Sequence, residues 1–180
     1  MPTETVQQYS YTPAQAEVVR LQDRYRRCLL DQKYYAYRLS LYQGWDTSSN
    51  VFAGIAMVLS LVTRPSSNLW LSYICYATGI VAALIFIAKP IFRISDRIER
   101  YTLLHYGYAD VFNKIEDLVS EIRQSGKMTA EQRLKASEIF DRCATLALRE
   151  DPTHNHKKLA KFQSDVEVAI PPETLWIPSE

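Results

Sequence analysis

Glycine is scarce in this chain, and the catalytic motifs that depend on glycine are missing. Only 5 of the 180 residues are glycine. We find no glycine-rich phosphate loop and no serine nucleophile elbow, both of which need glycine at tight turns. His154 and His156 flank one asparagine but have no acidic or thiol partner at a ligand spacing, so a solvated turn is favoured over a metal site. The sequence therefore predicts no enzyme, no metal and no cofactor.

Cysteine is equally scarce. The chain has three cysteines, Cys28, Cys75 and Cys143. Their number is odd and their spacing matches no metal site, so we expect neither a disulfide framework nor a zinc motif. Reduced cysteines fit a domain that faces the cytoplasm.

Charge is absent from the middle of the chain, although the composition as a whole looks soluble. Charged residues make up 23% of the sequence and the net charge is +1, which implies no strongly acidic or basic partner. Between Asp46 and Lys89, however, Arg64 is the only charged residue. This gap directs attention to the segments on either side of Arg64.

Two uncharged runs, 47–63 and 65–88, have the composition of membrane spans. A helix that crosses a bilayer needs about 20 apolar residues, which the second run supplies alone and the first supplies if Trp45 lies at the interface. The alternative is a buried hairpin in a soluble bundle, but such helices usually keep a polar stripe. The first run begins too far from the N-terminus to be a signal peptide. We expect a two-helix transmembrane hairpin.

The polar segment 64–68 suits a turn between the two spans, and charge predicts their orientation. Basic residues crowd both flanks of the hairpin, whereas the turn carries Arg64 alone. The basic flanking residues are Arg20, Arg24, Arg26, Arg27, Lys33 and Arg38 before the hairpin and Lys89, Arg93, Arg97 and Arg100 after it. The positive-inside rule places both termini in the cytoplasm. We expect the hairpin to lie in the inner (plasma) membrane.

Two seams with apolar spacings of three and four flank the hairpin, which is the pattern of coiled-coil helices. The first comprises Val18, Leu21, Tyr25, Cys28, Gln32, Tyr35, Leu39 and Tyr42, and the second comprises Ile91, Ile94, Ile98, Tyr101, His105, Tyr108, Phe112, Ile115, Val119 and Ile122. We expect the two helices to lie side by side. Gln32 and His105 either form a polar layer that fixes register or oligomeric state, or face water.

Capping signals mark where the helices begin and end. Thr12 and Thr129 each precede a glutamine at capping-box spacing, and Gly126 is a C-cap candidate. Pro90 is expected to kink the chain, and Pro152 to end the helix that follows Thr129.

The predicted fold is an all-α membrane protein with a hairpin and cytoplasmic helical extensions. Its predicted parts are a tail (1–12), a cytoplasmic amphipathic helix (13–45), a transmembrane hairpin (46–89), cytoplasmic helices (90–165) with a short helix near 157–163, and an extended tail (166–180) containing Trp176.

Basic and aromatic residues alternate next to the hairpin, and this pattern is typical of ligand sites for phosphates and bases. The candidate ligand-binding residues are Arg38, Arg93, Arg97, Arg100, Tyr35, Tyr101, His105 and Tyr106. The spacing of Arg93, Arg97 and Arg100 predicts that they share one helix face. The alternative is that the same residues contact anionic lipid headgroups.

Small residues recur every four positions in the second span, and partly so in the first, and they predict close helix packing between copies. The stripes are Cys75, Gly79 and Ala83 in the second span and Ala53, Ala56 and Ser60 in the first. We therefore expect a homo-oligomer in the lipid bilayer that assembles through the two seams and these small residues.

The order of these parts resembles the SLATT family, small two-transmembrane effectors of bacterial antiphage systems. The resemblance covers residues 14–161 and includes the string Leu148-Arg149-Glu150-Asp151-Pro152. It implies an oligomeric pore or ion channel, with a tetramer favoured, that a nucleotide or oligonucleotide opens or holds shut. It also implies a partner nucleotidyltransferase that makes the signal. The residues alone leave open a membrane-anchored coiled-coil scaffold that binds a protein partner.

Overall fold

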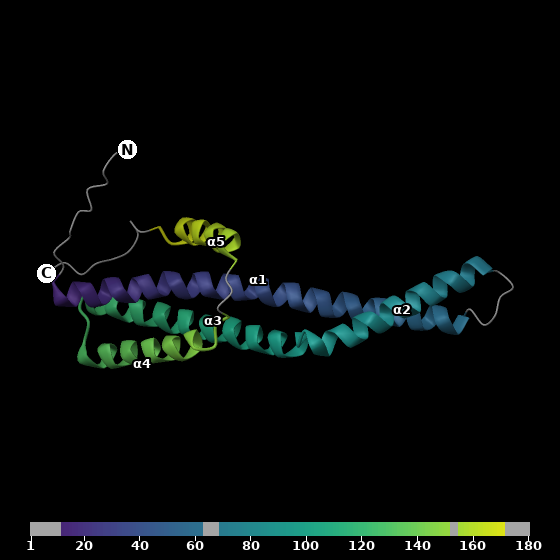
Figure 1. Cartoon of the computed structure of the whole chain (residues 1–180). Helices are drawn as coiled ribbons and strands as arrows, with labels where there is room; N and C mark the ends of the chain where they lie inside the picture. Colours follow the sequence, from purple (N-terminus) through teal and green to yellow (C-terminus); the bar gives the residue numbers. More distant parts are fainter. Residues whose placement is uncertain (1–11, 63–68, 152–154, 172–180) are drawn as a thin grey trace. The chain divides into compact units, whose positions relative to one another are not determined.

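The chain is built from five helices within the described residues 12–62, 69–151 and 155–171 of the computed structural model (Figure 1). They are α1 (Pro13–Val62), α2 (Leu69–Ile91), α3 (Ile94–Ser125), α4 (Ala130–Ala147) and α5 (His156–Ala169). No strand occurs in these ranges, so the predicted all-α fold is confirmed. The predicted turn at 64–68 and Trp176 lie outside the described residues.

Local sequence signals explain most helix ends. The backbone N–H of Thr12 donates to Oε1 of Gln15 (3.0 Å) at the start of α1. At the end of α3, Gly126 takes φ 71° and its N–H donates to the carbonyl of Ile122 (2.9 Å). A left-handed residue at this position is nearly free of cost only for glycine. Both predicted boundaries are confirmed.

The α4 boundaries agree with prediction at one end only. Thr129 and Gln132 form the predicted capping box, with each side chain accepting a backbone N–H of the other residue. The helix ends at Ala147, before the predicted stop at Asp151-Pro152. The chain then continues in a turn in which the N–H of Arg149 donates to the carbonyl of Leu146 (2.9 Å).

Helix α5 is longer than predicted. Asn155 is its N-cap, and its Oδ1 accepts the N–H of Lys158 (3.2 Å). The helix extends to Ala169, so the prediction of an extended tail is wrong for residues 166–169. Val166 is buried, and burial of this apolar side chain stabilises the last turn.

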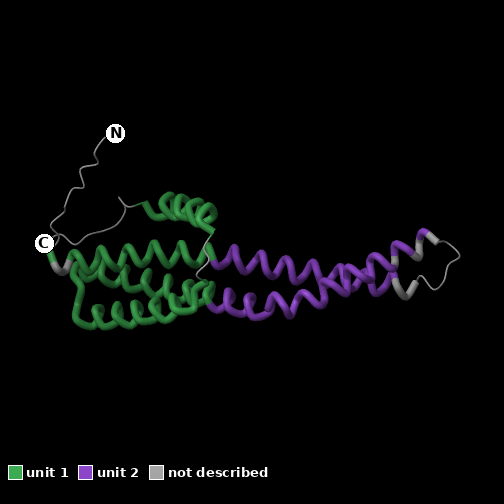
Figure 2. The backbone as a smooth tube through the Cα atoms, viewed as in Figure 1, with its two compact units in different colours: residues 1–34, 104–180 green, residues 35–103 purple. Residues whose placement is uncertain are grey.

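The helices form two compact units (Figure 2). Unit 1 comprises residues 1–34 and 104–180, and unit 2 comprises residues 35–103. The described part of unit 1 contains the first part of α1, most of α3, and α4 and α5. Unit 2 contains the rest of α1, all of α2 and the start of α3.

Unit 1 has an apolar core to which four helices contribute. The rings of Tyr25 on α1 and Phe112 on α3 stack with centroids 4.5 Å apart. Between α3 and α4, a Cβ added to Gly107 would lie 2.6 Å from Cδ2 of Leu146, so glycine allows their close approach. The buried apolar residues are Val18, Leu21, Cys28 and Tyr34 of α1, Leu104, Tyr108, Val111, Ile115, Leu118 and Ile122 of α3, Ala136, Ile139, Cys143 and Leu146 of α4, and Val166 of α5.

Unit 2 contains the antiparallel hairpin. Nζ of Lys89 lies 2.8 Å from Oδ1 of Asp46 and 2.5 Å from Oδ1 of Asn50. Asp46 and Lys89 bracket the long segment that lacks charge, so the two ends of this segment meet in the fold. The pairing of the two predicted span segments is therefore a feature of unit 2 itself.

A sharp bend separates α2 from α3. The segments Tyr76–Ile91 and Ile94–Ser125 meet at 52°. Pro90 has no N–H to donate, which weakens the helix at this point, and the predicted kink is confirmed. Arg93 has φ 47° and therefore lies outside α3. The expectation that Arg93 shares a helix face with Arg97 and Arg100 is wrong for this reason.

The described helices meet the length and hydropathy expected of a membrane span only in part. Within the described ranges, no single helix is long and apolar enough to cross a bilayer. The bent pair Tyr76–Ile91 and Ile94–Ser125 meets the criterion when its two members are taken together.

Candidate ligand site

An arginine–tyrosine cluster in unit 2 contains half of the predicted ligand residues. Nη2 of Arg38 donates to the hydroxyl of Tyr101 (3.0 Å), and Nη1 of Arg97 donates to the hydroxyl of Tyr42 (2.7 Å). The Tyr101 ring lies 5.3 Å from that of Tyr42 and 6.1 Å from that of Tyr35, between centroids. The structure therefore brings Arg38, Arg97, Tyr35 and Tyr101 together.

The cluster holds its two guanidinium groups in fixed positions. Cζ of Arg38 lies 5.2 Å from the Tyr101 ring centroid, and Cζ of Arg97 lies 5.6 Å from that of Tyr42. A cation over a ring face is attracted by the ring quadrupole, and the hydroxyl contacts add a directional restraint. Sequence reasoning assigned Tyr42 to the first seam and missed its role here. Its position one helical turn after Arg38 was the available signal.

The tyrosines of the cluster are not platforms for a base. Tyr35 and Tyr101 are each 1% exposed. A base must reach an open ring face to stack, so these two buried rings are not available to it. Tyr101 instead contacts Arg38, and Tyr35 packs against Tyr101.

A cavity of about 500 Å³ opens beside the cluster. It has one cationic part, formed by Arg38, Lys89 and Arg97, and one predominantly apolar part. The other lining residues are Leu41, Tyr42, Trp45, Ile85, Ala88, Phe92 and Ile94. None of the described residues that line it is acidic, and Lys89 is paired with Asp46. Arg38 and Arg97 therefore provide the charge that favours an anion.

The remaining predicted residues lie elsewhere. Arg93 and Arg100 are exposed and do not line the cavity. His105 and Tyr106 belong to unit 1, with ring centroids 5.1 Å apart. Nδ1 of His105 lies 3.2 Å from the backbone carbonyl oxygen of Gln32. The two residues therefore meet within one chain, and a polar layer of their side chains that fixes register or oligomeric state stays a prediction.

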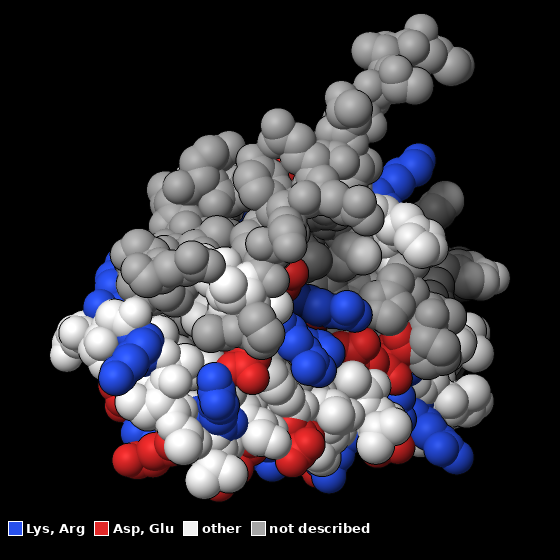
Figure 3. Space-filling model, turned by 90° about the vertical axis from the view of Figure 1, so that its left-hand side faces the viewer, with Lys and Arg blue, Asp and Glu red and all other residues white. Residues whose placement is uncertain are grey.

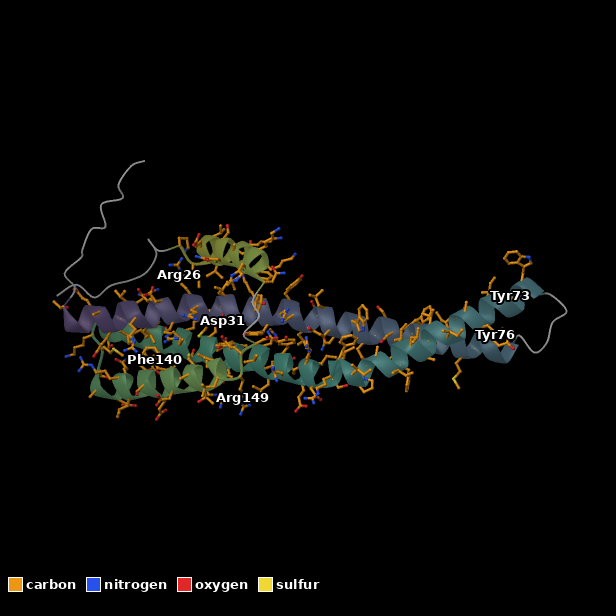
Figure 4. All side chains as sticks on the ribbon, in the orientation of Figure 1. Arg26, Asp31, Tyr73, Tyr76, Phe140 and Arg149 are labelled. Atoms are coloured by element: carbon orange, nitrogen blue, oxygen red, sulfur yellow. The ribbon has the colours of Figure 1, made fainter. Side chains whose placement is uncertain are left out.

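A second cavity, of about 590 Å³, lies in unit 1 between α1, the end of α4 and α5. Its lining mixes Arg26, Arg27 and His156 with the carboxyl groups of Asp31 and Glu150 (Arg26 and Asp31 are labelled in Figure 4). Sequence reasoning missed it, because no local signal shows where α5 docks.

Asp31 is electrostatically unusual. Burial, and then repulsion by Glu150, raise its pKa from 3.8 to about 7, against the opposing effect of Arg27 and Arg24. Nε of Arg27 is 3.9 Å from Oδ2 of Asp31. Because its charges are mixed, the cavity has no net preference for either sign of ligand.

Cys28 and Cys143 meet in the core of unit 1. Their Sγ atoms are 3.8 Å apart, and both thiols are free. The hydrogen bond between them and burial raise the pKa of Cys28, which keeps its thiol protonated. Among the described residues, no three His, Cys, Asp or Glu side chains are placed to hold a metal ion.

No protein-family model, curated protein or solved structure matches the chain.

Proposed function

We propose that this chain is an oligomeric membrane pore or ion-channel effector of antiphage defence, gated by a nucleotide or oligonucleotide signal. The observation that carries the membrane part of the proposal is the outward-facing apolar surface of unit 2. The resemblance of the order of parts to the SLATT family is the support for the pore, for its signal and for a partner nucleotidyltransferase.

The exposed apolar side chains of unit 2 need contact with an apolar medium or partner in place of water. Trp70 and Phe86 are 79% and 72% exposed, and Figure 4 shows Tyr73 and Tyr76 projecting from α2. Burial of apolar area is worth about 25 cal/mol per Å², so a long helix pair that leaves such side chains in water is strongly disfavoured. A lipid bilayer supplies the missing apolar contacts along both faces.

The ion pair between Asp46 and Lys89 is proposed to mark the cytoplasmic interface of this hairpin. Its charged groups end the uncharged segment on both helices, and the arginines of unit 2 follow directly. Charged groups at such a level stay hydrated, because lysine and arginine side chains reach the interface. This arrangement supports an inner-membrane location with both termini in the cytoplasm.

Assembly is proposed to use the outer face of α2. Gly79 and Ala83 are exposed, and a Cβ added to Gly79 would meet no atom of the chain within 4 Å. Small residues that face outward allow a second copy to approach closely. One two-helix hairpin cannot enclose a pore, so the proposed pore requires several copies, and the resemblance favours four. The side chain of Cys75 lies outside the described residues.

The scaffold alternative is less well supported. A coiled-coil partner would need apolar seam residues at the surface, but Leu21, Tyr35 and Ile115 are buried within their own units. The seams therefore stabilise the chain itself. The exposed residues Arg93 and Arg100 remain as proposed contacts for the nucleotide, because hydrated arginines suit phosphates.

Ion flux from liposomes containing the purified full-length chain tests the proposal. We expect a flux that changes when cyclic and linear di- and trinucleotides are added. The Gly79→Leu variant is the matched control, since it should insert but assemble poorly. Insertion of a cross-linkable oligomer that conducts no ions in any of these conditions would contradict the pore.

A further inference from the structure

We infer that the cavity of unit 2 binds one anionic phospholipid, with the phosphate at Arg38 and Arg97 and an acyl chain along Leu41, Trp45 and Phe92. The inference rests on the proposed membrane function, which it deepens by naming a resident ligand. It differs from general attraction of headgroups, because it places a single lipid in a defined site.

The cationic part of the cavity is preorganised for a phosphate. Contacts with the hydroxyls of Tyr101 and Tyr42 hold Arg38 and Arg97. Side chains that are already ordered lose little entropy when a ligand binds. Arginine donors suit phosphate oxygens, and both arginines line the cavity. The third cation of the lining, Lys89, is already paired with Asp46.

The apolar part of the cavity selects a lipid over a nucleotide. Ile85, Ala88 and Ile94 present only carbon atoms to the cavity from their side chains, and Phe92 and Trp45 are each 63% exposed. A base buried there would lose its hydrogen bonds to water without finding replacements, whereas an acyl chain has no such groups to satisfy. The combination of a cationic part and a hydrocarbon part is the chemistry of an anionic phospholipid.

The site also spans the bend between α2 and α3. Ile85, Ala88 and Lys89 line it from before the bend, and Ile94 and Arg97 line it from after the bend. A ligand that contacts both segments stabilises the arrangement in which its contacts are best satisfied. A bound lipid is therefore expected to stabilise this bend.

Native mass spectrometry of the full chain, purified in mild detergent and exposed to equal amounts of phosphatidylglycerol and phosphatidylcholine, tests the inference. We expect one retained phosphatidylglycerol per chain. The Arg38→Gln/Arg97→Gln variant should reduce its retention at least tenfold, and Phe92→Ala, at an exposed position, should reduce it without affecting folding. The matched control Arg93→Gln/Arg100→Gln removes the same charge outside the cavity and should retain the lipid.

Four results separate the possible failures. Equal loss of lipid in the cavity variant and in the matched control would overturn the site, because it would show diffuse headgroup attraction. Displacement of the lipid by inorganic phosphate or by a trinucleotide would also overturn it, since the acyl chain would then contribute nothing. If the wild-type chain fails to float with liposomes, the proposed membrane function fails. If it floats but retains no phosphatidylglycerol, only the lipid site fails.

Discussion

The two units differ in the exposure of their apolar side chains, many of which are buried in unit 1 and exposed in unit 2. Leu104 in unit 1 is 0% exposed, whereas Leu84 in unit 2 is 61% exposed. Unit 1 covers its apolar residues with a third and a fourth helix, while unit 2 has only two paired helices and the start of a third. The contrast shows that helical periodicity describes the packing of unit 1, but that the surroundings of unit 2 must supply the rest of its apolar contacts.

The arrangement of charged side chains also differs between the two units. The side turned to the viewer in Figure 3 intermixes acidic and basic side chains. In unit 1, Arg133 lies 2.8 Å from Glu17 and Lys135 lies 3.1 Å from Glu121. In unit 2, the ion pair of Asp46 and Lys89 lies at one end of the apolar helices. Acidic and basic side chains are thus paired on the surface of unit 1, and the pair in unit 2 joins the two helices that carry the long apolar segments.

The largest expected difference comes from truncating matched leucines. Leu104→Ala should destabilise unit 1 by about 2–5 kcal/mol, because it leaves a cavity in a closed core. Leu84→Ala should change the free energy of unfolding by less than about 0.5 kcal/mol in detergent, since its side chain packs little within the chain. Denaturant unfolding followed by circular dichroism measures both. Similar losses in the two variants would mean that unit 2 has a closed core of its own.

The next largest effect is a pH dependence confined to unit 1. The pKa of Asp31 is about 7 in the folded chain, so the native state holds a proton that the unfolded state releases near pH 4. Stability should therefore fall as pH rises from about 4 to 7, by roughly 2–4 kcal/mol. Asp31→Asn should remove this fall and be the more stable form at pH 8. An unchanged pH profile in Asp31→Asn would show that Asp31 is not the responsible group.

Substitutions of Gly107 in unit 1 and of Gly79 in unit 2 test how closely each position packs against another helix. Gly107→Leu should destabilise unit 1 by about 1–3 kcal/mol or more, because even a Cβ there is 2.6 Å from Leu146. Gly79→Leu should leave the free energy of unfolding unchanged but raise the monomer fraction in cross-linking experiments. Normal assembly of Gly79→Leu would exclude the outer face of α2 as the contact between copies.

The smallest expected effect is the loss of a surface ion pair. Arg133→Gln removes the contact with Glu17, and both side chains are largely exposed. Such pairs contribute about 0.2–1 kcal/mol, and salt screens them further. The difference from the wild type in thermal unfolding should be small and should vanish at high salt. A larger loss would indicate that this pair fixes α4 on α1.

The sequence was sufficient for features that depend on neighbouring residues. The capping box at Thr129, the glycine after α3 and the kink at Pro90 follow from local backbone chemistry, and all three are confirmed. The seams correctly identified Leu21, Tyr35 and Ile115 as buried, because they depend on periodicity alone. Such signals need no knowledge of what packs against the helix.

Features that depend on distant packing were missed. Leu104, Val111 and Leu118 are buried because α3 contacts α4 as well as α1, and a single seam describes one face only. In the ligand prediction, Tyr35 and Tyr101 looked like stacking platforms, but their partners across the helices bury them. The left-handed conformation of Arg93 also has no signal in the residue itself, since arginine rarely adopts it.

The most direct test of the account is the accessibility of unit 2 from the two sides of a membrane. In a background without native cysteines, Trp70→Cys and Arg100→Cys would be labelled with a membrane-impermeant maleimide in inverted and in right-side-out vesicles. We expect Trp70→Cys to react from the outside only and Arg100→Cys from the cytoplasmic side only, since α2 lies between them. Labelling of both positions from the same side would contradict a transmembrane hairpin.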